Sequence, residues 1–275
     1  MSTKPTSAAS SEMEAGHDAG APIVLSLVVP AFNEEKGIEA LVNAAADALA
    51  AITPRFEIIV VDDGSRDSTR ALLLARGETI PQLRSIFLRI NSGQHIATFI
   101  GLTESRGEFV FVADADQAAS LSGLATLYQV ALDDHGADIV TGVRETRSRS
   151  LHRSIGSQVV SWIVNRMSGT KLSDPAAPIR LYRRSTVAGI VGADVLAQNL
   201  PILTALLGYR IKEVPIPTTD SGRSSRYGLT RLIHVLLLAV LNFSAGTRTI
   251  LFMLTLGAVS TMAGFAGMAG LTIYG

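Results

Sequence analysis

The sequence contains no cysteine, so neither a disulfide framework nor a metal site built from thiolates is available to it. It also has no net charge, because 24 basic side chains balance 24 acidic ones. Apolar residues are not scarce: they make up 47% of the 275 residues, which excludes a chain that is disordered for want of a core. The length fits one large domain or two small ones, since a domain has roughly 100–200 residues.

The zero net charge conceals an uneven distribution along the chain. Residues 1–138 contain 19 acidic and 9 basic side chains, whereas residues 139–275 contain 5 acidic and 15 basic ones. An acidic half suits a bound cation, and a basic half suits phosphate groups or an anionic surface. Two solvated faces that merely differ in charge would give the same counts.

The two ends of the chain differ in composition. Residues 1–21 have no apolar run and lack the pattern of a secretory signal, so we expect a disordered tail. Residues 249–275 carry no charge and exceed the roughly 20 apolar residues that a bilayer requires, which predicts a transmembrane helix over 248–275. A buried core helix is the alternative. Within this stretch Ala263 and Gly267 have the four-residue spacing of small residues that permits close helix contact and a homo-oligomer.

A shorter apolar segment precedes the predicted span. Residues 232–245 are too few to cross a bilayer, and they predict an interfacial amphipathic helix over 229–247 that lies on the membrane. Four arginines lie on the N-terminal side of the span: Arg223, Arg226, Arg231 and Arg248. By the positive-inside rule they place the preceding domain in the cytoplasm, at the cell membrane.

Between the tail and the membrane segments, strands and helices are predicted to alternate. Short runs rich in Val, Ile and Phe, as in buried strands, occur at residues 23–29, 57–61, 85–88, 108–113 and 138–143. Between the first two, residues 38–52 carry an apolar stripe at helical spacing. This alternation predicts an α/β domain over 22–228 with a mostly parallel sheet.

Acidic residues follow three of the predicted strands, at the edge where open α/β sheets bind ligands. The segments are Asn33-Glu34-Glu35, Asp62-Asp63 with Gly64 to Thr69, and Asp114-Ala115-Asp116. Such strand ends would repel one another without a cation or sugar hydroxyls between them. The first segment could instead simply begin a helix, and Asp67 or Ser68 could be an ordinary N-cap.

Asp114 and Asp116 are the strongest candidates for a metal site. Side chains at positions i and i+2 of an extended strand point to the same side, so both carboxylates would converge. Oxygen ligands of this kind suit Mg²⁺ or Mn²⁺, which would in turn hold a diphosphate.

Taken in order, these motifs resemble a known family. The segments are Val29 to Glu34, Val61 to Thr69, Asn91 to His95, Asp114 to Asp116, Arg180 to Arg184 and Gly222 to Tyr227. They resemble family 2 glycosyltransferases with a GT-A fold, and among these the polyprenyl-phosphate glycosyltransferases. That group includes dolichol-phosphate mannose synthase, bactoprenol glucosyltransferase and undecaprenyl-phosphate formamidoarabinose transferase. The resemblance covers about residues 23–248 and implies a Rossmann-like nucleotide-diphospho-sugar transferase domain, followed by the two membrane helices.

The resemblance implies roles for residues of the acidic half. Pro30, Phe32 and Glu34 would line the nucleotide pocket, Asp62 or Asp63 would contact the base or ribose, and Asp114 and Asp116 would bind the metal and diphosphate. Relatives also carry a metal-binding Gln shortly after the second Asp. Here Gln117 stands one position early, which leaves its role as a ligand open.

The resemblance also implies roles for the basic half. Arg144 and Arg153 would face the phosphates, for which the planar guanidinium is suited. Asp174 and Arg180 match acceptor-side residues, although Ala176 to Ile179 replace a usual Gly. Arg223 and Arg226 lie in a loop that would hold the lipid phosphate at the membrane surface.

The expected function is therefore an inverting transfer of a sugar from a nucleotide-sugar donor to a polyprenyl phosphate at the bilayer, in cell envelope glycosylation. The acceptor oxygen is already anionic, so a strong general base is less necessary, and Asp174 would serve either to orient the acceptor or as a base. No nucleic-acid partner is expected. Two alternatives stay open: a membrane-anchored glycosyltransferase acting on a protein or polysaccharide, and a catalytically silent relative that binds nucleotide sugar or lipid phosphate. The sugar, the nucleotide and the choice of Mg²⁺ or Mn²⁺ are also open.

Overall fold

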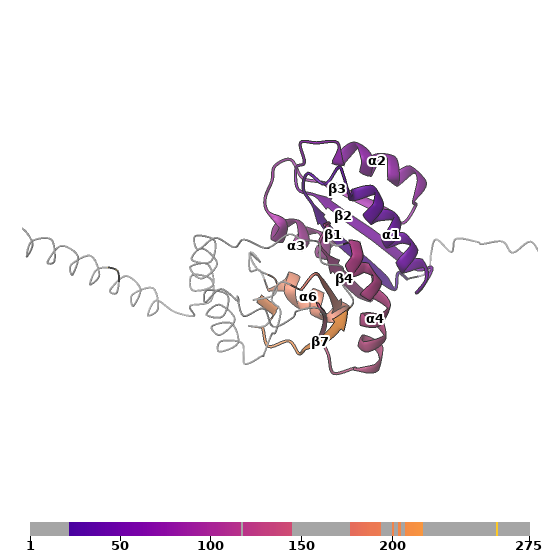
Figure 1. The fold of residues 1–275 in the computed structure, drawn as a ribbon. Helices are drawn as coiled ribbons and strands as arrows, with labels where there is room; N and C mark the ends of the chain where they lie inside the picture. The colour runs from indigo at the N-terminus through magenta and orange to yellow at the C-terminus, as the bar shows by residue number, and fades with distance from the viewer. Residues whose placement is uncertain are drawn as a thin grey trace, which may run out of the picture.

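The computed structural model describes residues 22–116, 118–144, 177–193, 200, 203–204, 207–216 and 257. The chain alternates strands and helices from residue 25 onward (Figure 1). The strands are β1 (Leu25–Ala31), β2 (Phe56–Asp62), β3 (Leu83–Phe87), β4 (Phe109–Ala113), β5 (Ile139–Arg144), β6 (Ile179–Arg183) and β7 (Ile211–Ile216). The helices are α1 (Ile38–Ala50), α2 (Thr69–Thr79), α3 (Gln94–Glu104), η1 (Ala118–Gly123), α4 (Leu124–Asp133) and α6 (Arg184–Gly192).

The described strands form one mixed sheet in the order β3-β2-β1-β4-β6-β5-β7. Strands β1 to β4 pair in parallel, as expected, and β5 pairs in parallel with β7. Between β4 and β5 lies β6, antiparallel to both. The five predicted strands are confirmed, but β6 and β7 were missed. Both are interrupted by charged residues or proline (IRLYR and IKEVPI), so neither has the apolar run by which the other strands were recognised.

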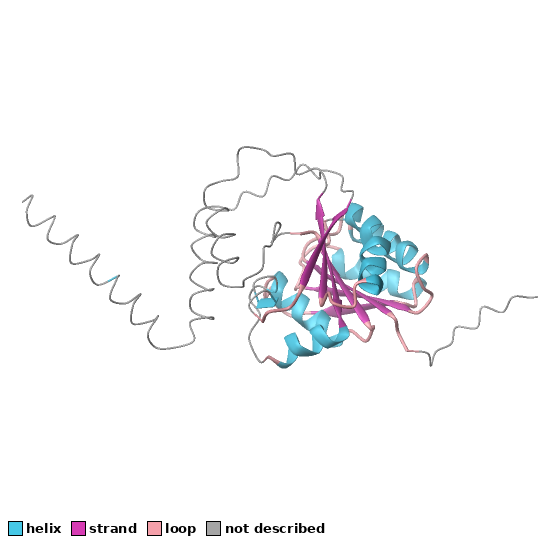
Figure 2. Cartoon of the chain, turned by 90° about the horizontal axis from the view of Figure 1, so that it is seen from below, coloured by secondary structure: helices cyan, strands magenta, loops and turns pink. Residues whose placement is uncertain are grey.

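Helices cover both faces of the sheet, which Figure 2 shows from below. One buried cluster joins the sheet to α1, η1 and α4, and a second joins the other face to α3 and α6. Every residue of β1 and β2 is consequently buried. Burial on both faces explains why these strands are continuous apolar runs rather than alternating ones.

Helix α1 confirms the helical stripe read from the sequence. Ile38, Leu41, Val42, Ala45 and Leu49 are its buried residues and lie on one side of the helix. The helix ends at Ala50, two residues before the last residue of the predicted stripe.

Helix α3 lies unusually close to β1. A Cβ atom added to Gly101 would lie 2.3 Å from Cγ1 of Val28, a separation that no real side chain tolerates. Glycine is therefore required for this contact between helix and strand. The close packing holds α3 against β1 (Figure 1).

A buried carboxylate ties the opposite edge of the sheet together. Glu57 is 3% exposed and accepts hydrogen bonds from the Ser26 hydroxyl (2.7 Å), the Arg106 backbone N–H (2.7 Å) and Arg84 (3.1 Å). A buried charge is tolerated only when it is hydrogen-bonded in this way. This acidic residue is thus structural and lies at the end of β2 away from the candidate site.

The predicted tail (1–21), interfacial helix (229–247) and transmembrane helix (248–275) lie outside the described residues, apart from Gly257. Within the part of the chain that the structure describes, no helix combines the length and apolar character needed to cross a bilayer. The predicted boundaries of these segments remain predictions.

Candidate active site

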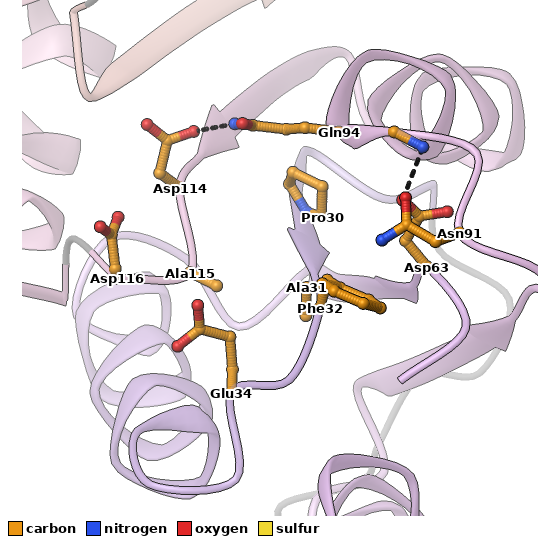
Figure 3. Close-up of a pocket in the computed structure, with 11 residues that line it drawn as sticks. Pro30, Ala31, Phe32, Glu34, Asp63, Asn91, Gln94, Asp114, Ala115 and Asp116 are labelled. Carbon is orange, nitrogen blue, oxygen red and sulfur yellow. Dashed lines mark hydrogen bonds between the residues drawn. The ribbon is translucent and has the colours of Figure 1, made fainter. Parts of the chain in front are cut away.

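An open cavity of about 350 Å³ lies at the carboxyl ends of β1, β2 and β4. Its walls are Pro30, Ala31, Phe32, Glu34, Asp63, Asn91, Gly93, Gln94, Asp114, Ala115 and Asp116 (Figure 3). Among these described lining residues four are acidic and none is basic. Such a cavity attracts a cation, and an anionic diphosphate could enter it only together with one.

The first wall of the cavity depends on two interlocked loops. Asn33, with a positive φ of 55°, donates its backbone N–H to the Ser65 hydroxyl (2.9 Å), and its side-chain oxygen accepts the N–H of Arg66 (2.9 Å). The next backbone N–H, that of Glu34, is donated to Thr69 Oγ1 (2.8 Å). The loops after β1 and β2 thereby hold each other in place.

Two further acidic side chains belong to the same interlock rather than to the cavity. Asp67 accepts the backbone N–H of Glu35 (3.2 Å), and Glu35 accepts that of Ser68 (3.1 Å). Desolvation raises the pKa of Asp67, but hydrogen bonds from the side chain and backbone of Thr69 and from Glu35 outweigh it and hold the pKa below its usual value. Glu35 and Asp67 are therefore structural, but not in the way expected: α1 begins only at Ile38, and α2 follows Ser68 without a side-chain cap hydrogen bond. Phe32 and Glu34 line the cavity.

The adjacent aspartates at the end of β2 are both buried, at 2% and 3% exposure. Asp62 accepts the backbone N–H of Ser65 (3.1 Å). Asp63 lines the cavity and accepts two backbone N–H groups, from Ser92 (2.7 Å) and Gly93 (2.8 Å), one on each oxygen. Asp63 therefore fixes the loop after β3, while a contact of either aspartate with a base or ribose remains a prediction.

That loop supplies cavity residues to which sequence reasoning assigned no role: Asn91, Gly93 and Gln94. Gly93 has a φ of +96°, a backbone conformation for which glycine is favoured. A Cβ on Gly64 would lie 2.8 Å from the carbonyl carbon of Ile90, so the loop after β2 also presses on this one. Their place in the loop that follows a parallel strand was the signal available in the sequence.

Asp114 and Asp116 both line the cavity, but the expected alternation of a strand does not bring them there. Strand β4 ends at Ala113, so the alternation of an extended strand does not continue through the two aspartates. Asp116 is instead exposed in a turn. Across the cavity the amide Nε2 of Gln94 donates a hydrogen bond to Asp114 Oδ1 (2.5 Å; Figure 3).

Of the remaining predicted site residues, the structure describes only Arg180 and the backbone of Arg144, and Arg180 is not among the residues that line the cavity. Arg180 lies in β6, where its charge and a hydrogen bond lower the pKa of the Tyr182 hydroxyl, although burial of the hydroxyl dominates and raises that pKa. The backbone of Arg144 ends β5, opposite Ile216. Gln117, Arg153, Asp174, Arg223 and Arg226 lie outside the described residues, so their roles remain predictions.

Comparison with known proteins identifies the family. The model of the family described as glycosyl transferase family 2 matches residues 26–189, which is more than half of the chain and includes every residue of the cavity. The chain belongs to glycosyl transferase family 2. The family expected from the motifs is thereby confirmed.

Similar family 2 proteins include the undecaprenyl-phosphate 4-deoxy-4-formamido-L-arabinose transferases of Yersinia pestis (strain Pestoides F) and Salmonella choleraesuis (strain SC-B67). The chain is 31% identical to the first and 29% identical to the second, over 214 residues in each case. The alignments cover 77% of this chain and 65% of the relatives, so the chain spans less than two thirds of their length.

Solved structures similar to this family 2 chain include glucosyl-3-phosphoglycerate synthase from Mycobacterium tuberculosis in complex with Mn²⁺, UDP and phosphoglyceric acid. Its TM-score is 0.59 at 17% identity, covering 82% of this chain and 80% of that one. The mannosyltransferase PcManGT from Pyrobaculum calidifontis, in complex with GDP-Man and Mn²⁺, has a TM-score of 0.55 at 18% identity, with 88% and 83% covered. These likenesses confirm the expected GT-A fold.

Proposed function

We propose that this chain transfers a sugar from a nucleoside-diphosphate sugar to a polyprenyl phosphate, with inversion at the anomeric carbon. The observation that carries the proposal is the cavity at the carboxyl edge of the sheet, whose described lining has four carboxylates and no basic side chain. The acceptor class is proposed from the two relatives, whose names specify undecaprenyl phosphate.

The cavity fits a divalent cation, Mg²⁺ or Mn²⁺, that is bound together with a diphosphate. In the described part of the chain, no three Asp, Glu or His side chains are close enough to hold an ion by themselves. Mg²⁺ is commonly bound by one or two carboxylates completed by substrate phosphates. We propose that Asp114 and Asp116 are these carboxylates and that the donor diphosphate supplies the remaining oxygens. Whether Gln117 is a third protein ligand is left open.

The chain's own residues would act mainly by placing the two substrates. Pro30, Phe32 and Glu34 would hold the nucleotide, with Asp62 or Asp63 at the base or ribose. The bound cation would stabilise negative charge on the departing diphosphate. An acceptor phosphate oxygen already carries negative charge, so it attacks the anomeric carbon without a strong base. The new C–O bond forms as the bond to the diphosphate breaks, and the electron pair leaves with the diphosphate.

The remaining roles fall on residues outside the described cavity. Asp174 would orient the acceptor. The arginines Arg144, Arg153, Arg180, Arg223 and Arg226 would face the phosphates of donor and lipid. Arginine suits this role because its planar fork binds phosphate in a bidentate manner.

We further propose that the GT-A domain (22–228) works at the cytoplasmic face of the cell membrane. The interfacial helix (229–247) and the span (248–275) would keep it beside the lipid phosphate, which stays at headgroup level. The basis for this is the apolar and arginine-rich sequence of residues 223–275.

The test is the transfer of label from a panel of nucleotide sugars to undecaprenyl phosphate by the purified full-length chain, with Mn²⁺ or with EDTA. We expect a lipid-linked product that requires the metal. A product on protein or polysaccharide instead would refute the lipid acceptor. Nucleotide binding without any product would refute the polyprenyl-phosphate acceptor and favour a different acceptor or the silent relative.

A further inference from the structure

The side-chain amide of Gln94 links two walls of the cavity by a hydrogen bond. It is the first residue of α3, it is exposed, and no side-chain hydrogen bond caps this helix. Its amide instead crosses to the end of β4, where Nε2 donates to Asp114 Oδ1 at 2.5 Å (Figure 3). The contact therefore fixes the orientation of one cavity carboxylate rather than the helix.

The chemistry of this contact suits a carboxylate that must bind a cation. An ionised carboxylate only accepts hydrogen bonds, so the amide must present its nitrogen. A neutral donor holds the carboxylate in one orientation but leaves its negative charge in place. A lysine or arginine at the same position would form an ion pair and oppose the approach of a second cation.

The backbone that carries Gln94 is held at several points. Asp63 accepts the two backbone N–H groups just before it, those of Ser92 (2.7 Å) and Gly93 (2.8 Å). On the helix side, the Thr98 hydroxyl donates to the Gln94 carbonyl (2.8 Å). A buried carboxylate that fixes the preceding loop thus determines where the Gln94 amide can reach.

We propose that Gln94 is a positioning residue that orients Asp114 for binding of a divalent cation and a nucleoside diphosphate, and that Asp63 holds Gln94 in place through the loop between them. This inference rests on the proposed function. Groups that hydrogen-bond to a metal ligand fix its geometry, and their loss typically weakens metal binding by about 10–100-fold.

The test uses Gln94→Met, which keeps the length of the side chain and removes its donor. The matched control is Gln129→Met. Gln129 is an exposed residue of α4 whose Nε2 donates to Asp133 Oδ1 (3.1 Å) away from the cavity. Mn²⁺ binding to the full-length protein is measured from the EPR signal of free Mn²⁺, with UDP or GDP present. We expect Gln94→Met to weaken Mn²⁺ binding by about 10–100-fold and Gln129→Met to leave it unchanged.

A double-mutant cycle separates positioning from a general structural effect. If Gln94 acts through Asp114, Gln94→Met should change Mn²⁺ affinity by less than about twofold in a chain that already carries Asp114→Asn. If Gln94→Met weakens Mn²⁺ binding as much in the Asp114→Asn chain as in the wild-type chain, the inference is overturned. Wild-type Mn²⁺ affinity in the Gln94→Met single variant would also overturn it.

The same measurements distinguish this inference from the proposed function. If the wild-type chain fails to bind Mn²⁺ in the presence of UDP and also in the presence of GDP, both the proposed function and the inference are contradicted. A wild-type chain that binds Mn²⁺ and nucleotide, with Gln94→Met equally competent, would overturn only the positioning role.

Discussion

Replacing Asp63 by asparagine is expected to loosen the loop after β3 without changing the shape of the side chain. Each oxygen of Asp63 accepts one backbone N–H, from Ser92 at 2.7 Å and from Gly93 at 2.8 Å, and the residue is 3% exposed. An asparagine side chain keeps one oxygen and turns an NH₂ group toward the other backbone donor. One partly buried N–H then loses its acceptor.

The magnitude follows from the kind of bond that is lost. A hydrogen bond to a charged group contributes about 1.5–3 kcal/mol, and the retained bond falls to the roughly 1 kcal/mol of a neutral pair. We expect Asp63→Asn to lower the free energy of unfolding by about 2–5 kcal/mol. For a domain of this size that corresponds to a fall in Tm of about 4–20 °C. If the loop can open locally at a lower free-energy cost than this, that local cost is the upper limit of the destabilisation.

Two measurements on the full-length chain check this. Thermal melts give the global effect, and hydrogen exchange of a peptide covering residues 88–94 gives the local one. Asp133→Asn is the control, because Asp133 is exposed and accepts only the Gln129 amide among the hydrogen bonds described, so its Tm should stay within about 2 °C of wild type. An Asp63→Asn chain with both wild-type Tm and wild-type exchange would refute the reasoning.

Three further experiments test other parts of the structure. Asp116→Ala should reduce turnover at least about 100-fold with an unchanged circular dichroism spectrum, because the residue is exposed in the cavity; an undiminished rate would remove it from the metal site. Gly101→Ala places a Cβ 2.3 Å from Val28 and should destabilise the fold by about 1–3 kcal/mol. Gly77→Ala, whose Cβ would meet nothing within 4 Å, should stabilise the fold by about 0.5–1 kcal/mol. Equal Tm values for the two variants would contradict the close packing of α3. Asp67 has a lowered pKa when folded, so its stabilising effect is present above about pH 4 and is lost as pH falls through the folded value. The Tm difference between wild type and Asp67→Asn should therefore shrink only below about pH 4, and a difference that instead shrinks between pH 7 and 5 would contradict this assignment.

The parallel part of the sheet was predictable because burial on both faces demands apolar runs. Strands β1 and β2 are such runs, and their partners β3 and β4 could be recognised in the same way. The antiparallel strand β6 was not, because charged residues interrupt it and one of them, Arg183, serves the fold. Arg183 donates to the backbone carbonyls of Ala131, Asp134 and Ala137, and no apolar periodicity reveals such a role.

The acidic part of the candidate site was also predictable, because several carboxylates at one sheet edge are electrostatically costly without a ligand. Chain order alone could not separate the acids that face the cavity from those that tie the loops together. Glu34 lines the cavity while Glu35, its neighbour, binds the next loop. Gln94 carries no charge, and its importance appears only once the structure brings it to Asp114.

The antiparallel insertion of β6 determines where this fold tolerates change. Strand β5 ends at Arg144, and β6 begins at Ile179, which pairs with Ala113 of β4 and Gly142 of β5. The carbonyl of the preceding residue, Pro178, accepts the backbone N–H of Asp114 at 3.4 Å. The segment between β5 and β6 therefore leaves and rejoins the sheet at the edge that carries the cavity. A change of length between the end of β5 and the start of β6 would therefore act at the cavity end of the sheet and leave the described order of strands as it is.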